Sequence, residues 1–304
     1  RWDYNGEKQE DGSGFLQFHI DKNHNRESGA TAFLNPIKNR PNLTIQTNAH
    51  VSKIVIENGQ AKGVSYLKGG KEETVLAKKE VIVSAGALAS PKILMLSGIG
   101  PAAHLEDHGI SLKTDLPGVG QNLQDHVQLP IIFKSELPIP NTTLLTGNVL
   151  FVRTRKESNM APPDMQINFT PSLPGPLAPI LPDFGGPICI FLAILVQPFS
   201  TGTVKLKSSD PLENAEVNPN YLQQNADVKA LEEAINIIRK IADTKAFEKL
   251  NAGEILPGTG DVEEFIRSQS STLWHPAGTC KIGQDAMSVV NSRLQVYGIK
   301  GLRV

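Results

Sequence analysis

The stretch EVIVSAGALASPKILMLSGIG, residues 80–100, decides the class of fold. Its first part, EVIVSA, is apolar without alternation, which is typical of a strand covered on both faces in a parallel sheet. A tight turn of small residues follows, and then a helix for which Ser90 is the expected N-cap and Pro91 lies in the first turn. Gly98 and Gly100 end this helix. The succession of strand, turn and helix predicts an α/β fold.

The segment before this stretch, residues 42–86, contains short β-rich runs that are separated by Asn-Gly and Gly-Gly turns. The expected strands are LTIQT, VSKIVIE, AKGVSYL, ETVLA and EVIVSA. Turns of this composition between short β-rich runs are typical of hairpins. The segment therefore predicts a small antiparallel meander that leads into the apolar strand.

The segment after this stretch changes character. Strands are expected at LPIIF, DMQINF, ICIFLAILVQ and GTVKLKS. The Pro/Gly-rich run at 171–187 is too long for a simple connection, and such loops often rim a binding site. A long amphipathic helix is expected over 226–250, with one apolar stripe that covers a sheet. The stripe consists of Leu231, Ala234, Ile235, Ile238 and Ile241.

The composition excludes several classes of function. The chain has 304 residues, 39% of them hydrophobic, and a net charge of -1, so it gives no bulk attraction for nucleic acid or for an anionic membrane. No apolar run is long enough to predict a membrane span. The two cysteines, Cys189 and Cys280, form neither a disulfide framework nor a zinc motif and are expected to be buried thiols.

Common catalytic and binding motifs are absent or weak. No Gly pair extends to a G-x-G-x-x-G after a predicted strand, and no G-x-S-x-G stands at the strand-to-helix turn. His104 and His108 have the i, i+4 spacing of a metal pair, but the H-E-x-x-H order and a third ligand are missing. We therefore predict a solvated helix face at these histidines and no metal site.

His275, in the run STLWHPAGTCKIG at 271–283, is the strongest candidate for chemistry. A histidine can accept a proton near neutral pH, and the Trp-His-Pro context is expected to give the ring a stiff, partly dry setting. Small residues follow, so the backbone there can approach a flat ligand closely. Spacing alone leaves two interpretations equally open, a catalytic histidine and a core histidine with satisfied hydrogen bonds.

Four blocks resemble those of the glucose-methanol-choline (GMC) oxidoreductases, a family of FAD-dependent alcohol oxidases and dehydrogenases. GALASPKILMLSGIG is similar to the second signature of the family. The runs PNLTIQTNAHVSKI, LPGVGQNLQDHV and WHPAGTCKIG with LQVYGIKGLRV are similar to further blocks. DYNGEKQEDG and AFLNPI resemble the insect branch, which includes glucose dehydrogenases.

The resemblance implies a cofactor, FAD, and roles for four residues. His275 matches the catalytic base, which takes the hydroxyl proton while a hydride passes from the alcohol carbon to the flavin. Val51 matches the position whose backbone pairs with the adenine, Gly86 opens the signature turn, and Trp274 matches the residue beside the isoalloxazine. The Trp274 side chain is also expected to pack against the strand behind it.

The implied activity leaves alternatives open. The first is a dehydrogenase or oxidase that takes hydride from glucose, another sugar or a small alcohol and passes electrons to oxygen or a quinone. The second is a non-redox family member such as a hydroxynitrile lyase, and the third is a catalytically idle binding protein of the same fold. The residues do not distinguish these three.

The resemblance also implies a domain plan. An FAD/NAD(P)-binding Rossmann-like domain is expected at 1–130 and again at 271–304, and an antiparallel-sheet substrate domain with α+β character at 131–270. The family's phosphate-binding Gly motif and its second catalytic residue are not present, so we expect the middle of a longer enzyme, inactive and weak in FAD binding by itself.

Three sequons, at Asn42, Asn141 and Asn168, would permit N-glycosylation in a secretory compartment. Together with the family resemblance they favour a secreted, extracellular protein. This expectation depends on which of the three side chains is accessible in the folded chain.

Overall fold

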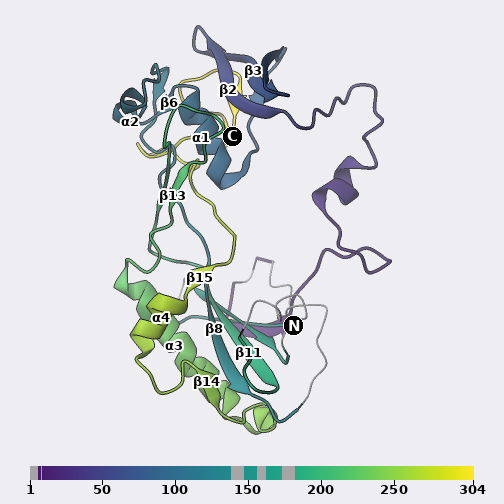
Figure 1. The fold of residues 1–304 in the computed structure, drawn as a ribbon, viewed down its shortest axis with the longest axis vertical. Helices are drawn as coiled ribbons and strands as arrows, with labels where there is room; N and C mark the ends of the chain where they lie inside the picture. Colours follow the sequence, from purple (N-terminus) through teal and green to yellow (C-terminus); the bar gives the residue numbers. More distant parts are fainter. Residues whose placement is uncertain (1–5, 8, 138–146, 156–161, 173–181) are drawn as a thin grey trace. The chain divides into compact units, whose positions relative to one another are not determined.

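The computed structural model describes all residues except 1–5, 8, 138–146, 156–161 and 173–181. The chain forms two compact units, which are drawn in Figure 1 and described separately below. Unit 1 comprises Arg1–Leu16, Gln124–Gly202 and Pro219–Ala277. Unit 2 comprises Gln17–Leu123, Thr203–Asn218 and Gly278–Val304.

Unit 1 is built on an antiparallel seven-stranded sheet in the order β1-β9-β10-β11-β8-β14, with β15 also paired to β8. Its strands are β1 (Gly12–Phe15), β8 (Val127–Lys134), β9 (Asn148–Val152), β10 (Met165–Thr170), β11 (Ile188–Leu195), β14 (Glu254–Leu256) and β15 (Ser271–Thr272). The strands expected at LPIIF, DMQINF and ICIFLAILVQ are confirmed as parts of β8, β10 and β11. Residues 173–181 of the expected loop lie outside the described chain.

Two helices, α3 (Asn225–Ala242) and α4 (Val262–Gln269), lie beside β8 in unit 1 (Figure 1). The sheet contributes alternate side chains of β8, namely Leu129, Ile131 and Phe133, to the core beneath them. The predicted apolar stripe of α3 is confirmed: four of its five members are fully buried, and Ile241 packs against the same core. A short 3-10 helix, η3 (Lys245–Phe247), follows α3.

Unit 2 contains the predicted meander, formed by β2 (His50–Glu57), β3 (Gln60–Lys68) and β4 (Lys71–Leu76). Asn58 and Gly59 both have positive φ in the first turn, at 49° and 72°, as a two-residue hairpin of type I′ requires. The strand expected at LTIQT is wrong, because β2 begins at His50 and no described residue pairs with that run.

The apolar run EVIVSA forms only a short strand, β5 (Val81–Ile82), which pairs in parallel with β16 (Leu302–Arg303). The parallel pairing is confirmed. The prediction that both faces are covered is wrong, because the Ile82 side chain is 61% exposed while Val81 is buried. A second parallel pair joins β6 (Ile99–Gly100) to β7 (Thr114–Asp115).

Helix α1 (Gly86–Leu96) begins earlier than predicted, so Ser90 is not its N-cap. Gly86 starts the helix at φ +82°, a value that favours glycine, and the Ser90 Oγ accepts the N–H of Ala85 from inside the first turns at 3.1 Å. Pro91 lies within the helix instead of in its first turn. Gly98, at φ +84°, follows the last turn as predicted.

The other described elements of unit 2 are short. They are η1 (Ala30–Leu34), α2 (Ala102–Asp107), β12 (Thr203–Lys205) and β13 (Glu216–Asn218). The strand expected at GTVKLKS is confirmed as β12, which pairs with β13. None of the described helices has the length and apolar character that a membrane crossing requires.

The bounds of the two units differ from the expected domain bounds of 1–130, 131–270 and 271–304. Residues 203–218 group with unit 2, where the N–H of Val204 donates to the carbonyl of Gly120 at 2.7 Å. Residues 1–16 group with unit 1, because β1 pairs with β9. Which unit binds FAD and which binds substrate stays a prediction.

Candidate active site

The four predicted site residues fall into two pairs. Val51, in β2, and Gly86, at the start of α1, belong to unit 2. Trp274 and His275 belong to unit 1 and follow β15 directly. Each pair is described within its own unit, and the roles of all four residues stay predictions.

A buried carboxylate lies at the centre of the His275 segment. The Asp125 side chain, at 7% exposure, accepts the backbone N–H of His275 at Oδ1 over 2.8 Å. Its Oδ2 accepts the hydroxyls of Thr272 and Tyr221, each at 2.5 Å. A buried charge is costly unless it is hydrogen-bonded, and here three donors satisfy it. Asp125 therefore connects its own segment with the segments that carry Tyr221 and His275.

The backbone at Trp274 is strained. Its φ is +59°, in the left-handed region that a bulky residue rarely adopts, and its N–H donates to the Thr272 Oγ1 at 2.8 Å. The side chain is 76% exposed, so the expected packing against a strand is wrong. Backbone strain of this kind gathers at functional sites and persists only where neighbouring contacts enforce it.

The imidazoles of His275 and His126 face each other. Their Nδ1 atoms lie 3.2 Å apart and their ring centroids 5.2 Å apart, with the planes near perpendicular. His275 is exposed, so the expected partly dry setting is wrong for its ring in this chain. One Nδ1 must donate and the other accept. If His275 donates, its Nε2 keeps a lone pair and can accept a proton.

Burial shapes the acid–base character around this pair. It lowers the pKa of His126, and the neighbouring His275 lowers that pKa further, so His126 tends to stay neutral and able to accept. Burial, reinforced by the hydrogen bond to Asp125, raises the pKa of Tyr221 to about 12. Tyr221 therefore remains a hydrogen-bond donor to Asp125 at neutral pH.

In unit 2, the start of α1 offers a place for a flat, anionic group. A Cβ atom placed on Gly86 would have no other atom within 4 Å, so the space beside this backbone is open. The helix carries neither a capping side chain at Ala85 nor an acidic residue in its first turn. Helix N-termini favour negative charge, so these features fit a dinucleotide.

Val51 lies at an irregular point of its strand. It pairs with Tyr66, and a bulge between Val51 and Lys53 interrupts the ladder immediately afterwards. Bulges locally release backbone groups from strand pairing. This geometry fits the implied pairing of the Val51 backbone with an adenine.

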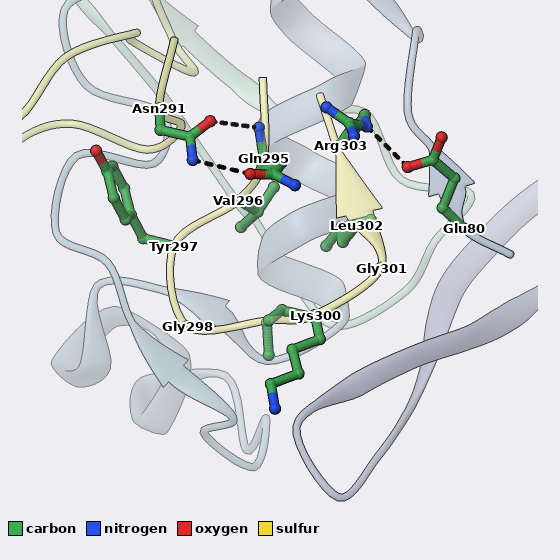
Figure 2. A pocket seen from close by; sticks show the side chains of 11 residues that line it. Glu80, Asn291, Gln295, Val296, Tyr297, Gly298, Lys300, Gly301, Leu302 and Arg303 are labelled. Atoms are coloured by element: carbon green, nitrogen blue, oxygen red, sulfur yellow. Dashed lines mark hydrogen bonds and ion pairs between the residues drawn. The ribbon is translucent and has the colours of Figure 1, made fainter. Parts of the chain in front are cut away.

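A cavity of about 470 Å³ in unit 2 includes none of the four predicted residues in its lining. It is lined by the segment that leads into β16 and by Glu80 (Figure 2). Arg303 Nε donates to Glu80 Oε2 at 2.7 Å, and the side chains of Asn291 and Gln295 pair at 3.1 Å. Of the three charged residues that line this cavity, Glu80 and Arg303 are thus paired with each other, and Lys300 is the third.

The remaining predictions concern histidines and thiols. His104 Nε2 accepts the N–H of Leu206 at 3.1 Å, so His104 is held by the protein instead of by solvent alone. Throughout the described part of the chain, no cluster of three or more His, Cys, Asp or Glu side chains could hold a metal ion. Both thiols are free: Cys189 is buried and Cys280 is partly buried.

Asp125, His126, Thr272 and Tyr221 belong to none of the catalytic or metal-binding motifs considered for the sequence. Asp125 and His126 stand in the run LPGVGQNLQDHV, which resembles a family block and so carried a signal. Thr272 and Tyr221 carried none, because their hydroxyls become relevant only when folding brings them to Asp125.

Comparison with known proteins decides the family. Residues 2–128 and 198–304 match the N-terminal and C-terminal sequence profiles that are both described as GMC oxidoreductase. The chain belongs to the GMC oxidoreductase family. Members of this family are FAD-dependent, and the resemblance drawn from the sequence is thereby confirmed.

Two curated relatives are similar over nearly the whole chain. An alcohol dehydrogenase [acceptor] of Pseudomonas putida is 37% identical over 339 residues, which cover 99% of this chain and 59% of the relative. An oxygen-dependent choline dehydrogenase of Sinorhizobium medicae is 37% identical over 334 residues, with the same two coverages. The chain thus spans about 59% of the length of these relatives.

Solved structures confirm the fold class. Pyridoxine 4-oxidase from Mesorbium loti has a TM-score of 0.87 at 27% identity and covers 96% of this chain and 58% of its own. An FAD-dependent oxidoreductase from Chaetomium thermophilum has a TM-score of 0.81 at 25% identity, over 96% and 62% of the two chains. The mixed strands and helices of this chain therefore belong to the GMC flavoenzyme fold.

Proposed function

We propose that the protein is an FAD-dependent oxidoreductase that acts on the CH–OH group of a small alcohol, with His275 as the proton acceptor. The observation that carries this proposal is the arrangement at His275, whose backbone is anchored by Asp125 and whose ring is paired with His126. Family membership supports the reaction class, and the exposed ring of His275 supports access for a substrate.

FAD, when bound, supplies the acceptor for the hydride. The backbone of Val51, the open turn at Gly86 and the exposed ring of Trp274 are the groups that would hold it. The flat, 76% exposed indole is suited to lie against another aromatic system. This assignment follows the matching positions of the family, and the geometry of unit 2 is compatible with it.

His275 removes the proton of the substrate hydroxyl. The O–H bond breaks and its proton goes to the imidazole, while the C–H bond breaks and its electron pair leaves as hydride, so that a C=O bond forms. An alkoxide alone is rare at neutral pH, and a base within hydrogen-bond reach lowers the barrier. Acceptance at Nε2 requires the tautomer in which His275 donates from Nδ1 to His126.

The donor is proposed to be a primary or secondary alcohol, with a sugar such as glucose as one possibility. The relatives are an alcohol dehydrogenase and a choline dehydrogenase, which supports an alcohol donor without selecting the sugar. The electron acceptor is proposed to be oxygen or a quinone, and the name of the choline enzyme supports oxygen.

Anaerobic titration tests this function. The protein, expressed at the full length of its relatives and loaded with FAD, is mixed with glucose, choline and a series of small alcohols. Bleaching of the oxidised flavin band by at least one alcohol is the expected result. A flavin that stays oxidised with every alcohol, or that bleaches equally without one, contradicts the proposal and favours the non-redox or idle alternatives.

An extracellular location is part of this proposal and depends on the sequons. Asn42 is exposed, whereas the Asn168 side chain is 8% exposed within β10 and accepts from Gln166 at 3.0 Å. Asn141 lies outside the described residues. Secretion from a eukaryotic host should therefore give a glycan at Asn42 and none at Asn168, as peptide mapping would show. A secreted protein without glycan at Asn42 would remove this support.

A further inference from the structure

One side chain, that of Asp125, bonds directly to the backbone of His275 and to a second residue of the same turn. Asp125 bonds to the backbone of His275 itself at Oδ1, and to the hydroxyl of Thr272 three residues earlier at Oδ2. The same Thr272 oxygen accepts the N–H of Trp274. Asp125 thus holds residues 272–275 at two points, while the N–H of Leu273 donates to the carbonyl of His126 at 3.0 Å and the Thr272 carbonyl accepts from Gln128 at 2.9 Å.

This turn needs such support because its backbone is strained. The left-handed region is unfavourable for a non-glycine residue, and Trp274 adopts it at φ +59°. The large side chains of Trp274 and His275 are exposed and contribute little packing that could offset this cost. Hydrogen bonds to a buried charge are stronger than neutral ones and can supply the offset.

We infer that Asp125 is a positioning residue for the proposed reaction: its carboxylate fixes the backbone of His275 and so the direction of the imidazole. This inference rests on the proposed role of His275 as proton acceptor. Asp125 acts on the main chain and not on the ring, because its hydrogen bond with His275 is to the backbone N–H. Its role is thus distinct from that of His126, which faces the ring.

A matched control exists within the same unit. Asp164 is 4% exposed and accepts the backbone N–H of Thr154 at 2.7 Å and its hydroxyl at 2.6 Å. Asp164 resembles Asp125 as a buried carboxylate that accepts one backbone N–H and the hydroxyl of a threonine, but it has an ion pair with Arg155 at 3.6 Å in place of the second hydroxyl. A substitution at Asp164 therefore measures the loss of a buried carboxylate, together with its ion pair to Arg155, outside the turn that carries His275.

The experiment compares three variants of the FAD-loaded, full-length protein by stopped-flow reduction with a saturating alcohol. Asp125→Ala is expected to lower the rate constant of flavin reduction about 10²-fold, because misplacement of a reacting group by about 1 Å has an effect of this size. Asp125→Asn keeps an oxygen for the His275 N–H and should retain most of the rate. Asp164→Ala should reduce at the wild-type rate once normalised to bound flavin.

Amide hydrogen exchange over peptides that contain residues 271–277 gives a readout that is independent of activity. Exchange at the His275 amide should be slow in the wild type and in Asp125→Asn, and fast in Asp125→Ala. Three outcomes would each overturn the inference. The first is a wild-type rate of flavin reduction and a wild-type rate of exchange in Asp125→Ala. The second is an equal loss of the reduction rate in Asp125→Ala and Asp164→Ala, and the third is a loss of that rate in Asp125→Asn as large as in Asp125→Ala.

Failure of the proposed function is recognisable separately. If no alcohol reduces the wild-type flavin, the function fails, and the exchange measurement still decides whether Asp125 holds the His275 backbone. If Asp125→Ala does not fold, the inference is tested by Asp125→Asn and by the exchange rate of the wild type. Fast wild-type exchange at His275 would then overturn the inference.

Discussion

The hydroxyl of Thr279 donates a hydrogen bond of 2.6 Å to the carbonyl oxygen of Ala87. In a regular helix this carbonyl would accept the N–H of the residue four positions later, but that residue is Pro91, which has no N–H. Thr279, at 1% exposure, replaces the missing donor. The bond explains how a proline is tolerated inside α1.

Thr279→Val should therefore destabilise the protein. The substitution keeps the shape of the side chain but leaves the Ala87 carbonyl without its donor. Because Ala87 is only partly buried, we expect a loss of about 1 kcal/mol in the free energy of unfolding. Urea unfolding measures the loss. Thr279→Ser keeps the hydroxyl and is the control. Equal midpoints for Thr279→Val and the wild type would show that water satisfies the carbonyl.

The elements that could be predicted from the sequence are those with a strong local pattern. The stripe of α3, the Asn-Gly turn at Asn58 and the stop at Gly98 depend on periodicity or on backbone conformations that few residues allow. Helix α4 has a local signal as well, which was not among the expected elements: Asp261 precedes Glu264 by three positions and accepts its N–H at 3.0 Å.

The centre of the candidate site could not be predicted in this way. Asp125 and His275 are 150 positions apart, and neither spacing nor composition relates them. His275 was found because a histidine between Trp274 and Pro276 is conspicuous, whereas the resemblance alone decided its role. The early start of α1 could not be predicted either. A proline inside a helix normally leaves one carbonyl without an N–H donor, which favours a place in the first turn for Pro91. The hydrogen bond from Thr279 to the Ala87 carbonyl removes this cost.

His126 should make stability depend on pH in the acidic range. Burial lowers its folded-state pKa below the ordinary 6.5, so the unfolded chain binds the proton more readily. The contribution of His126 to the free energy of unfolding is present above pH 6.5 and is lost as the pH falls through its folded-state pKa. The midpoint of urea unfolding should fall from pH 7 to pH 5, and His126→Gln should flatten this slope.

His104 contributes with the same sign, since burial and then His108 lower its pKa as well. His126→Gln should thus remove part of the slope, and His104→Gln a further part. His19→Gln, at an exposed position, is the control and should leave the slope unchanged. A His126→Gln variant with the full wild-type slope would show that His126 takes up its proton equally in both states.

The two thiols should be unreactive in the native protein. Burial raises the pKa of Cys280 to about 12 and that of Cys189 to about 11, and the thiolate is the reactive form. Alkylation at pH 8 should be slow at both residues until denaturant is added. Cys280→Ser should leave turnover unchanged if it folds, because the proposed reaction uses no thiol.

The same pKa values predict the behaviour in alkali. Both folded-state values lie above the ordinary 9.0, so the contribution of these thiols is intact below pH 9 and is lost as pH rises towards 11 to 12. Urea midpoints between pH 8 and pH 10.5 measure this trend. Rapid labelling of native Cys280, or a midpoint that rises over this range, would contradict the assignment of buried neutral thiols.

His275→Ala in the full-length, FAD-loaded protein gives the sharpest test of the proposed reaction. The His275 ring is exposed, so its removal should leave the fold and the flavin content intact. The reductive half-reaction should slow by about 10²–10⁴-fold, which is the usual contribution of one positioned base. Reoxidation of the flavin by a quinone should not change, because the hydroxyl proton is taken before that step.

A purely structural role for His275 predicts a different pattern. The variant would then be unstable and poor in flavin, while its remaining holoenzyme would reduce at the normal rate. His19→Ala, at an exposed position in unit 2, controls for the loss of a histidine in general. Stopped-flow rates normalised to bound flavin separate the two roles, and a near wild-type rate in His275→Ala would exclude His275 as the base.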